Sequence, residues 1–143
     1  MNKKILIIIL CIGLLGMLAG LLSRVLSGPA AFPVAELNAS RKVLVGYFEA
    51  WQKEQPDTMY AFISSRDKAV VSAAEYVQQF NDLPVAPLKY SIDSLTGSGS
   101  EVHAVVTVYW PGVEQDDLDK KQEQFFLVKE ATWKINEKKS LAK

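Results

Sequence analysis

The chain has 143 residues, enough for one domain and a short appendage, and its 16 basic and 16 acidic side chains give no net formal charge. Three basic residues, Lys3, Lys4 and Arg24, lie in or beside an N-terminal apolar segment, whereas every acidic residue lies at or after Glu36. Subtracting these three leaves 13 basic against 16 acidic residues, a net charge of −3. This balance argues against nucleic-acid binding, which needs a basic face. The single cysteine, Cys11, excludes a disulfide within the chain and a cysteine-rich metal site.

The N-terminal segment Ile5–Leu22 is apolar throughout. As a helix it would extend about 27 Å, close to the hydrocarbon thickness of a bilayer. We therefore expect a cytoplasmic start over 1–4 and a transmembrane helix over 5–26. Lys3 and Lys4 predict a cytoplasmic N-terminus, so the rest of the chain would lie outside the cytoplasmic membrane. The length of the run favours an uncleaved signal-anchor, while the small residues Gly28–Ala31 leave a cleaved signal peptide as the alternative.

Two further features concern this segment and the linker after it. Gly16 and Gly20 have the four-residue spacing that lets two membrane helices approach closely, although glycine is also simply frequent in membrane helices. Residues 27–35 form a short linker stiffened by Pro29 and Pro33, which would hold the following domain near the membrane surface.

A long amphipathic helix is predicted from about residue 36 to Glu54. Apolar side chains recur on one stripe at helical spacing, and this stripe requires burial; it comprises Leu37, Leu44, Tyr47, Phe48 and Trp51. Pro56 ends this helix and opens a second, shorter one. Residues 64–68 are expected to form a polar loop. A third helix begins at Ser72, where Glu75 completes a capping box, and ends before Pro84.

From Leu88 onward the hydrophobic period changes from helical to alternating, which predicts strands. The second strand has one apolar face, from Val102 to Trp110, against which the helical stripe is expected to pack. The third and fourth strands are predicted over 121–129 and 133–136, and residues 137–143 are expected to form a loose polar tail. Helices followed by antiparallel strands predict an α+β domain over 36–136, with three helices packed on a sheet of about four strands.

The stretches GYFEAWQKEQPDTMYAFIS (46–64), SAAEYVQQF (72–80) and FFLVKEATWKI (125–135) resemble those of the NTF2-like superfamily, especially its small membrane-anchored extracytoplasmic members. The resemblance implies a cone of helices closing a curved sheet, with a pocket between the first helix and the concave face. Relatives include enzymes, such as ketosteroid isomerase and scytalone dehydratase, and assembly modules. Members commonly have a glycine in the last hairpin turn, whereas this chain has Glu130-Ala131-Thr132.

The residues give little support for catalysis. An isomerase needs a carboxylate base and an acidic donor in an apolar cavity. Glu49 lies off the helical stripe, Asp93 points away from the predicted core, and Asp57 has an ordinary role at a helix start. The only histidine, His103, is expected on the outer face of the sheet, without partners for a metal site. We therefore expect a protein that is not an enzyme and that needs no cofactor or metal.

Two kinds of binding remain. Aromatic side chains with polar tips could line a pocket mouth, or they could simply fill the core of a small domain; they are Tyr47, Tyr60, Tyr90, Trp51 and Trp110. The outer face of the second strand carries Val105 and Tyr109, which are unusually apolar for a solvent-facing surface and suggest a protein partner or a second copy. The sequence thus predicts a non-catalytic, membrane-anchored binding or assembly module that is a subunit of an envelope complex. The alternatives are a pocket for a small apolar ligand or peptide, or an isomerase- or dehydratase-like enzyme.

Overall fold

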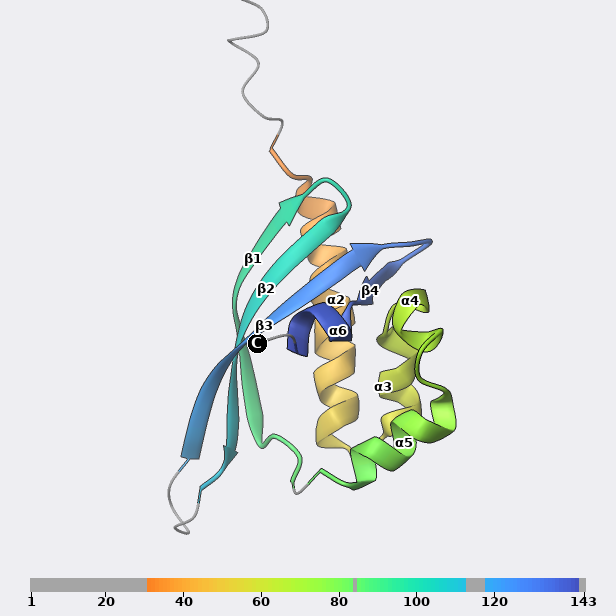
Figure 1. Cartoon of the computed structure of the whole chain (residues 1–143). Coiled ribbons are helices and arrows are strands. Elements are labelled where there is room, and N and C mark those ends of the chain that lie inside the picture. Colours follow the sequence, from red (N-terminus) through yellow and green to blue (C-terminus); the bar gives the residue numbers. More distant parts are fainter. Residues whose placement is uncertain (1–30, 84, 113–117, 142–143) are drawn as a thin grey trace, which may run out of the picture. The chain divides into compact units, whose positions relative to one another are not determined.

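The computed structural model describes residues 31–83, 85–112 and 118–141, in which helices pack against an antiparallel sheet of four strands in the order β1-β2-β3-β4. Figure 1 shows the helices on one side of the twisted sheet. This arrangement confirms the predicted α+β class. The helices are α2 (Val34–Gln52), α3 (Pro56–Phe62), α4 (Ser65–Lys68), α5 (Ala73–Asn81) and α6 (Glu137–Leu141), and the strands are β1 (Lys89–Ser98), β2 (Glu101–Pro111), β3 (Leu118–Lys129) and β4 (Trp133–Ile135).

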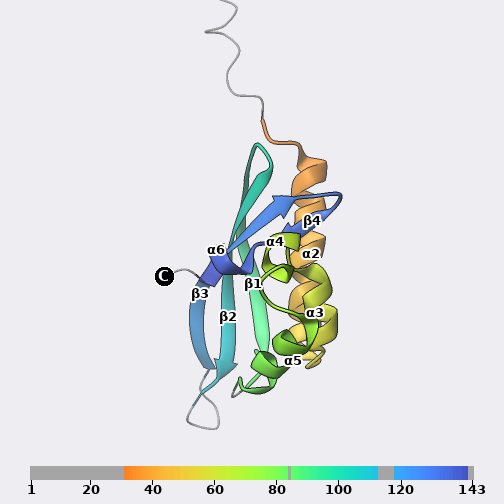
Figure 2. The same ribbon diagram turned by 45° about the vertical axis from the view of Figure 1, so that its right-hand side comes forward.

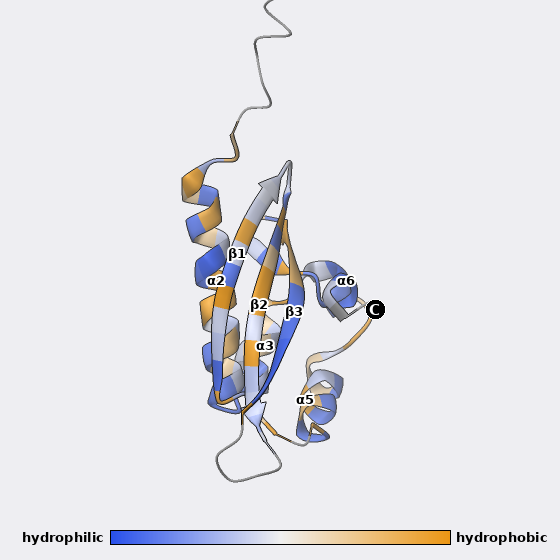
Figure 3. Ribbon diagram, turned by 90° about the vertical axis from the view of Figure 1, so that its left-hand side faces the viewer, coloured by the Kyte–Doolittle hydropathy of each residue, from blue (hydrophilic) through white to orange (hydrophobic). Residues whose placement is uncertain are grey.

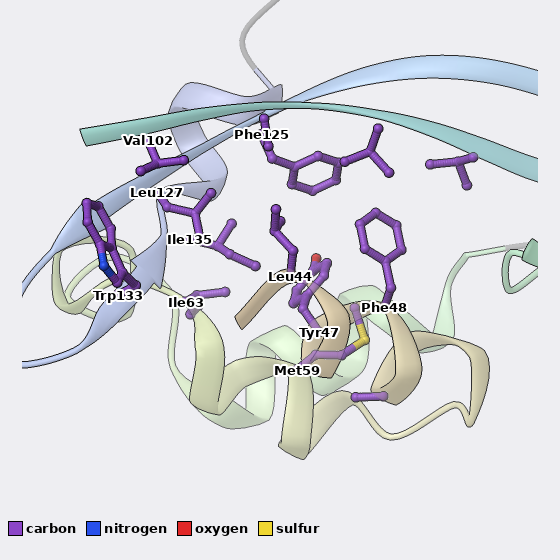
Figure 4. Packing of buried hydrophobic residues seen from close by; sticks show 14 of the residues in the cluster. Leu44, Tyr47, Phe48, Met59, Ile63, Val102, Phe125, Leu127, Trp133 and Ile135 are labelled. Carbon is purple, nitrogen blue, oxygen red and sulfur yellow. The ribbon is translucent and has the colours of Figure 1, made fainter. Parts of the chain in front are cut away.

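The core lies between the apolar stripe of α2 and the inner face of the sheet, as the sequence predicted. Leu44 and Phe48 of α2 are fully buried, and the alternating residues of β2 from Val102 to Val108 are fully buried opposite them. Figure 4 shows these side chains meeting Phe125 and Leu127 of β3. Each large apolar side chain gains roughly 1.5–3 kcal/mol from such burial, which explains why a stripe of moderate amphipathicity suffices to place α2.

The turn between α2 and α3 forms where Pro56 prevents the first helix from continuing. Glu54 adopts a left-handed φ of 53°, Gln55 donates its N–H to the Ala50 carbonyl at 2.9 Å, and Pro56 occupies the first turn of α3. The two helices then approach closely at Gly46, because a Cβ there would lie 2.5 Å from Cζ of the Phe62 ring. The absent side chain of Gly46 therefore makes room for Phe62.

The segment expected to be a polar loop instead contains the one-turn helix α4. The Ser64 side chain accepts the N–H of Asp67 at 3.2 Å and donates to the Asp67 carboxylate at 2.7 Å. This local cap satisfies the free N–H groups of a short turn, a pattern that the polar composition alone does not distinguish from a loop. The capping box predicted at Ser72 and Glu75 is confirmed, with both reciprocal bonds present.

The strands follow the predicted alternation of buried and exposed residues, and β3 is longer than predicted. β1 and β2 form a hairpin whose turn has Gly99 at a φ of 58°, and a bulge between Ile92 and Ser94 shifts their register. β3 begins at Leu118 rather than 121 and pairs with β2 along its length. The last turn needs no glycine, because Glu130 donates its N–H to the Thr132 carbonyl at 3.0 Å without a left-handed residue.

The outer face of the sheet carries His103, Val105, Thr107 and Tyr109, all half-buried. Figure 3 shows β1, β2 and β3 from this side, with the helices behind them. His103 stacks on Phe126 with ring centroids 4.7 Å apart, and its Nε2 is buried without a partner among the described residues. The histidine therefore lies on the face opposite the core, as predicted.

The segment expected to be a loose tail instead begins with helix α6, which lies against β3 (Figure 2). Asn136 accepts the Lys139 N–H at 3.0 Å as a helix cap, and Ser140 accepts the Phe126 N–H at 3.0 Å along the edge of β3.

Within residues 31–83, 85–112 and 118–141, no helix has the length and apolar character to cross a membrane. The predicted anchor over 5–26, including Gly16 and Gly20, lies outside these residues.

Candidate functional site

Two adjoining cavities lie between α2, α5, α6 and the inner face of β2 and β3. They share four lining residues, Tyr47, Trp51, Trp110 and Glu137. The cavity toward α5 has a volume of about 320 Å³, and the cavity toward β3 has a volume of about 220 Å³. A further space of about 310 Å³ extends the first cavity along Trp51 and Trp110. This concave region is the candidate functional site, because such pockets are the usual place for ligand binding.

Aromatic rings form most of the wall of the cavity toward α5, from here on called the α5 cavity. Trp51 and Trp110 meet edge to face with ring centroids 5.3 Å apart, and Tyr47 lies 6.0 Å from Trp51. The indole Nε1 of Trp51 is buried without a hydrogen-bond partner among the described residues, so the accessible part of this ring is hydrocarbon. The remaining wall residues are Met59, Tyr76, Gln79, Phe80, Leu83 and Glu137.

The inner end of the site holds one carboxylate, Glu137, bound by two tyrosines. Tyr47 and Tyr76 each donate a hydroxyl hydrogen bond of 2.7 Å to the same oxygen, Oε1, and their own hydroxyl oxygens lie 3.4 Å apart. Glu137 is half-buried, whereas both tyrosines are buried. The second carboxylate oxygen, Oε2, has no hydrogen bond to any described residue, and both cavities reach this side chain.

The electrostatics of this cluster follow from burial. Desolvation raises the pKa of Glu137 above its ordinary value, the hydroxyls of Tyr76 and Tyr47 lower it in part, and the nearby Asp67 charge raises it further. Burial, together with the Glu137 charge, raises the pKa of Tyr47 and of Tyr76 well above the usual range. Both tyrosines therefore remain neutral donors, and the carboxylate has only neutral groups to stabilise its charge.

A second carboxylate, Asp67, fixes Glu137 in place. Asp67 is buried, and its Oδ2 accepts the backbone N–H of Glu137 at 2.9 Å and the Ser64 hydroxyl at 2.7 Å. This contact joins α4 to the start of α6 across 70 residues of sequence. An acidic residue at a helix N-terminus is favoured by the free N–H groups there. Asp67 is thus a positioning residue for the carboxylate in the cavity.

The structure brings together three of the five aromatic residues that the sequence singled out, since Tyr47, Trp51 and Trp110 line both cavities. The other two line neither of them. Tyr60 donates its hydroxyl to the Val71 carbonyl at 3.0 Å, and Tyr90 stacks on Phe48 in the core with centroids 4.7 Å apart. Whether the cavities bind a ligand stays a prediction.

The two outer-face residues lie apart from the cavities. Val105 and Tyr109 are half-buried on β2, and the Lys89 amine lies 5.3 Å from the centre of the Tyr109 ring. The part of the chain that the structure describes contains no group of three or more histidine, cysteine, aspartate or glutamate side chains that could hold a metal ion.

Sequence reasoning missed Glu137, Asp67 and Tyr76 as site residues. The signal for Glu137 was present, since Asn136 followed by Glu-Lys-Lys is a helix-start pattern directly after a strand. The signal for Tyr76 was its place on the apolar side of the third helix. Nothing in the sequence indicated that these side chains converge on Tyr47, because they lie 29 and 90 residues away from it.

Comparisons with known proteins add a fold likeness. No family model matches the chain, and no curated protein matches it. Among solved structures, the chain is similar to a Campylobacter jejuni protein named "Putative NTF2-like transpeptidase", with 14% sequence identity and a TM-score of 0.47. The match covers 67% of this chain and 96% of that chain. At this score and identity, the likeness carries no argument about what the chain binds or does.

Proposed function

We propose that this protein is a non-catalytic binding module whose ligand site is the pair of cavities between α2, α5, α6 and the sheet. One observation carries the proposal: of two adjoining cavities, the one of about 320 Å³ has a wall made mainly of aromatic and aliphatic side chains around the hydrogen-bonded cluster of Glu137, and the one of about 220 Å³ reaches the same cluster. A few polar groups in an apolar cavity are the usual composition of a small-molecule site. The ligand class is a small, largely apolar molecule or peptide.

The placement of this module is part of the proposal. The apolar run Ile5–Leu22, flanked by Lys3 and Lys4, supports a single-pass anchor in the cytoplasmic membrane with the α+β domain outside it. Together with the resemblance of residues 46–64, 72–80 and 125–135, this run supports the proposal of a small membrane-anchored protein of NTF2-like type. A ligand taken up by the module would then be bound close to the membrane surface.

One observation favours the enzyme alternative: the carboxylate of Glu137 lies in an apolar cavity. An isomerase would use this group as its base, and it would need a separate acidic donor at the reacting atom. The two candidate donors, the hydroxyls of Tyr47 and Tyr76, already donate to Glu137 itself. The cluster therefore holds a charge in place more readily than it moves a proton between two substrate atoms, and we propose binding.

Energy transfer from tryptophan to an apolar dye tests the proposal on the full-length chain in lipid nanodiscs, with empty nanodiscs as the reference. We expect saturable transfer, and we expect Trp51→Ala to weaken binding at least about tenfold, which corresponds to about 1.4 kcal/mol. Trp133→Phe is the matched control, because Trp133 packs against Phe32 in the core and lines neither cavity. Far-ultraviolet circular dichroism verifies that each variant is folded. Transfer equal to that of empty nanodiscs, or equal binding by Trp51→Ala, would contradict the proposal.

An assembly role is the second candidate, and the outer face of the sheet favours it. Val105 and Tyr109 are half-buried there, and Figure 3 shows that the helices lie behind this face. A sheet face in contact with water is usually polar, so these two side chains fit a protein contact, either with a second copy or with another subunit of an envelope complex. Tyr109→Glu should shift the protein to a smaller species in size-exclusion chromatography with light scattering. An unchanged mass would count against this role.

A further inference from the structure

The α5 cavity contains one charged side chain among its lining residues. That side chain is Glu137, and the other eight residues are aromatic, aliphatic or amide side chains. The ion pairs within the described residues join Lys121 to Glu123, Lys129 to Glu36 and Lys139 to Glu101, and none involves Glu137. The negative charge at the inner end of the cavity is therefore stabilised by two phenol hydroxyls and by no cation of the described chain.

Burying a carboxylate without an opposite charge is costly, and this cost is what a suitable ligand can recover. Glu137 loses hydration through burial, and the nearby Asp67 charge adds to the cost. The neighbouring cavity does not supply a positive charge to compensate, because its Lys121 forms an ion pair with Glu123 at 2.6 Å. Charge complementarity thus favours a ligand that carries a positive charge into the α5 cavity.

The rest of the wall fits the same chemistry. Five aromatic rings line the α5 cavity, and these belong to Tyr47, Trp51, Tyr76, Phe80 and Trp110. Aromatic faces attract cations, most strongly when the cation is desolvated, and tryptophan is the strongest partner. A compact, fully hydrated cation gains little in such a place, whereas an ammonium group with alkyl substituents gains both the ring contacts and apolar burial.

We propose that the α5 cavity binds an organic cation, with a substituted ammonium group held between the aromatic rings and the carboxylate of Glu137. This assignment rests on the proposed binding function and specifies the chemistry of its ligand. An anionic ligand would meet Glu137 without a basic residue in the wall of this cavity. A neutral ligand would leave the carboxylate uncompensated. A cation with an apolar body satisfies both the charge and the rings.

Three probes of similar shape and different charge test the assignment. Choline carries a trimethylammonium group, 3,3-dimethylbutan-1-ol is its neutral isostere, and 3,3-dimethylbutanoate is an anion of similar shape. Titrations of the full-length chain in nanodiscs would be followed by calorimetry and by tryptophan fluorescence. We expect choline to bind at least about tenfold more tightly than the alcohol, a factor that corresponds to about 1.4 kcal/mol, and the anion to bind most weakly.

Two variants locate the effect. Glu137→Gln should remove the preference for choline over the alcohol, and Trp110→Leu should reduce it several-fold while keeping an apolar wall. If Glu137→Gln fails to fold, the preference for choline measured with Trp110→Leu still tests whether the cation binds in the α5 cavity. The matched control is Glu101→Gln, because Glu101 is an exposed acidic residue paired with Lys139 at 2.9 Å, outside both cavities. This control should keep the preference for choline.

The outcomes separate the two levels of the proposal. Equal affinity for choline and the alcohol would refute the proposal that the ligand is an organic cation. If dye transfer were still saturable and sensitive to Trp51→Ala, the proposed binding function would not be affected. A preference for choline that survives both Glu137→Gln and Trp110→Leu would also refute the organic-cation proposal, because the cation would then bind elsewhere. Failure of the dye and of all three probes to bind would refute the binding function itself.

Discussion

Removing the hydroxyl of Tyr76 should destabilise the protein by an amount that depends on pH. This hydroxyl donates a 2.7 Å hydrogen bond to Oε1 of Glu137, and of the two phenol bonds it does more to lower the pKa of that carboxyl. A hydrogen bond to a charged group contributes about 1.5–3 kcal/mol, whereas one between neutral groups contributes about 0.5–1.5 kcal/mol. Tyr76→Phe should therefore cost the larger amount where Glu137 is ionised and the smaller amount where it is protonated.

The sign of the pH dependence follows from linkage. The folded-state pKa of Glu137 lies above the ordinary value of 4.5, so the folded state binds this proton more tightly than the unfolded state does. As the pH rises from 4.5 through the raised value, Glu137 loses its proton in the fold and the unfolding free energy decreases. Tyr76→Phe raises the pKa of Glu137 further, so the decrease becomes larger and continues to higher pH.

Chemical denaturation of the full-length chain between about pH 4 and pH 8, followed by tryptophan fluorescence, measures this difference. Tyr60→Phe is the matched control, because the Tyr60 hydroxyl donates to a neutral group, the Val71 carbonyl, at 3.0 Å. Its cost should be about 0.5–1.5 kcal/mol at every pH. Carboxylates whose pKa is lowered, such as Glu75, are common to both variants and cancel in the comparison. Parallel pH profiles for Tyr76→Phe and Tyr60→Phe would refute the reasoning.

Three further substitutions test the supporting structure, each by the midpoint of denaturation. Asp67→Ala should cost about 2–4 kcal/mol, because it leaves the N–H of Glu137 and a buried hydroxyl without their acceptor; a loss below about 1 kcal/mol would mean that water replaces it. Gly46→Val should cost about 1–3 kcal/mol through overlap with Phe62, while Gly46→Ala should cost less since it gains about 1 kcal/mol of helix propensity. Equal losses would show that Phe62 moves freely. Ser72→Ala should cost about 1 kcal/mol by removing the capping box of α5, and no change would contradict that role.

Most of the fold was predictable because its determinants are local. The apolar stripe of α2, the stop at Pro56 and the capping box at Ser72 each act within a few residues, and each is confirmed. The alternation of β2 likewise placed Val108 inward and His103 outward. The errors occurred where a short polar stretch forms a single helical turn, at α4 and α6, because a cap of one residue decides the outcome there.

The candidate site was only partly predictable because contacts far apart in the sequence create it. The sequence singled out five aromatic residues as possible pocket residues, and Tyr47, Trp51 and Trp110 do line the cavities. Tyr90 and Tyr60 do not, because Tyr90 stacks on Phe48 in the core and Tyr60 packs against Tyr76 of α5. Glu137 was assigned to a tail, since neither its neighbours nor its charge indicates burial. Its position depends on Asp67, which joins it across 70 residues, and on Tyr47, which joins it across 90.

The same contacts connect the site to the stability of the domain. The Glu137 carboxylate accepts hydrogen bonds from Tyr47 of α2 and Tyr76 of α5, and the Glu137 backbone N–H donates to the Asp67 carboxylate of α4. Four helices thus meet at one half-buried carboxylate whose charge lacks a cation within the described chain. Stability alone would favour an apolar side chain here, because burying a carboxylate without an opposite charge is costly. The presence of an anion at the meeting point of the helices, beside aromatic cavities, is the physical reason to look for a ligand there.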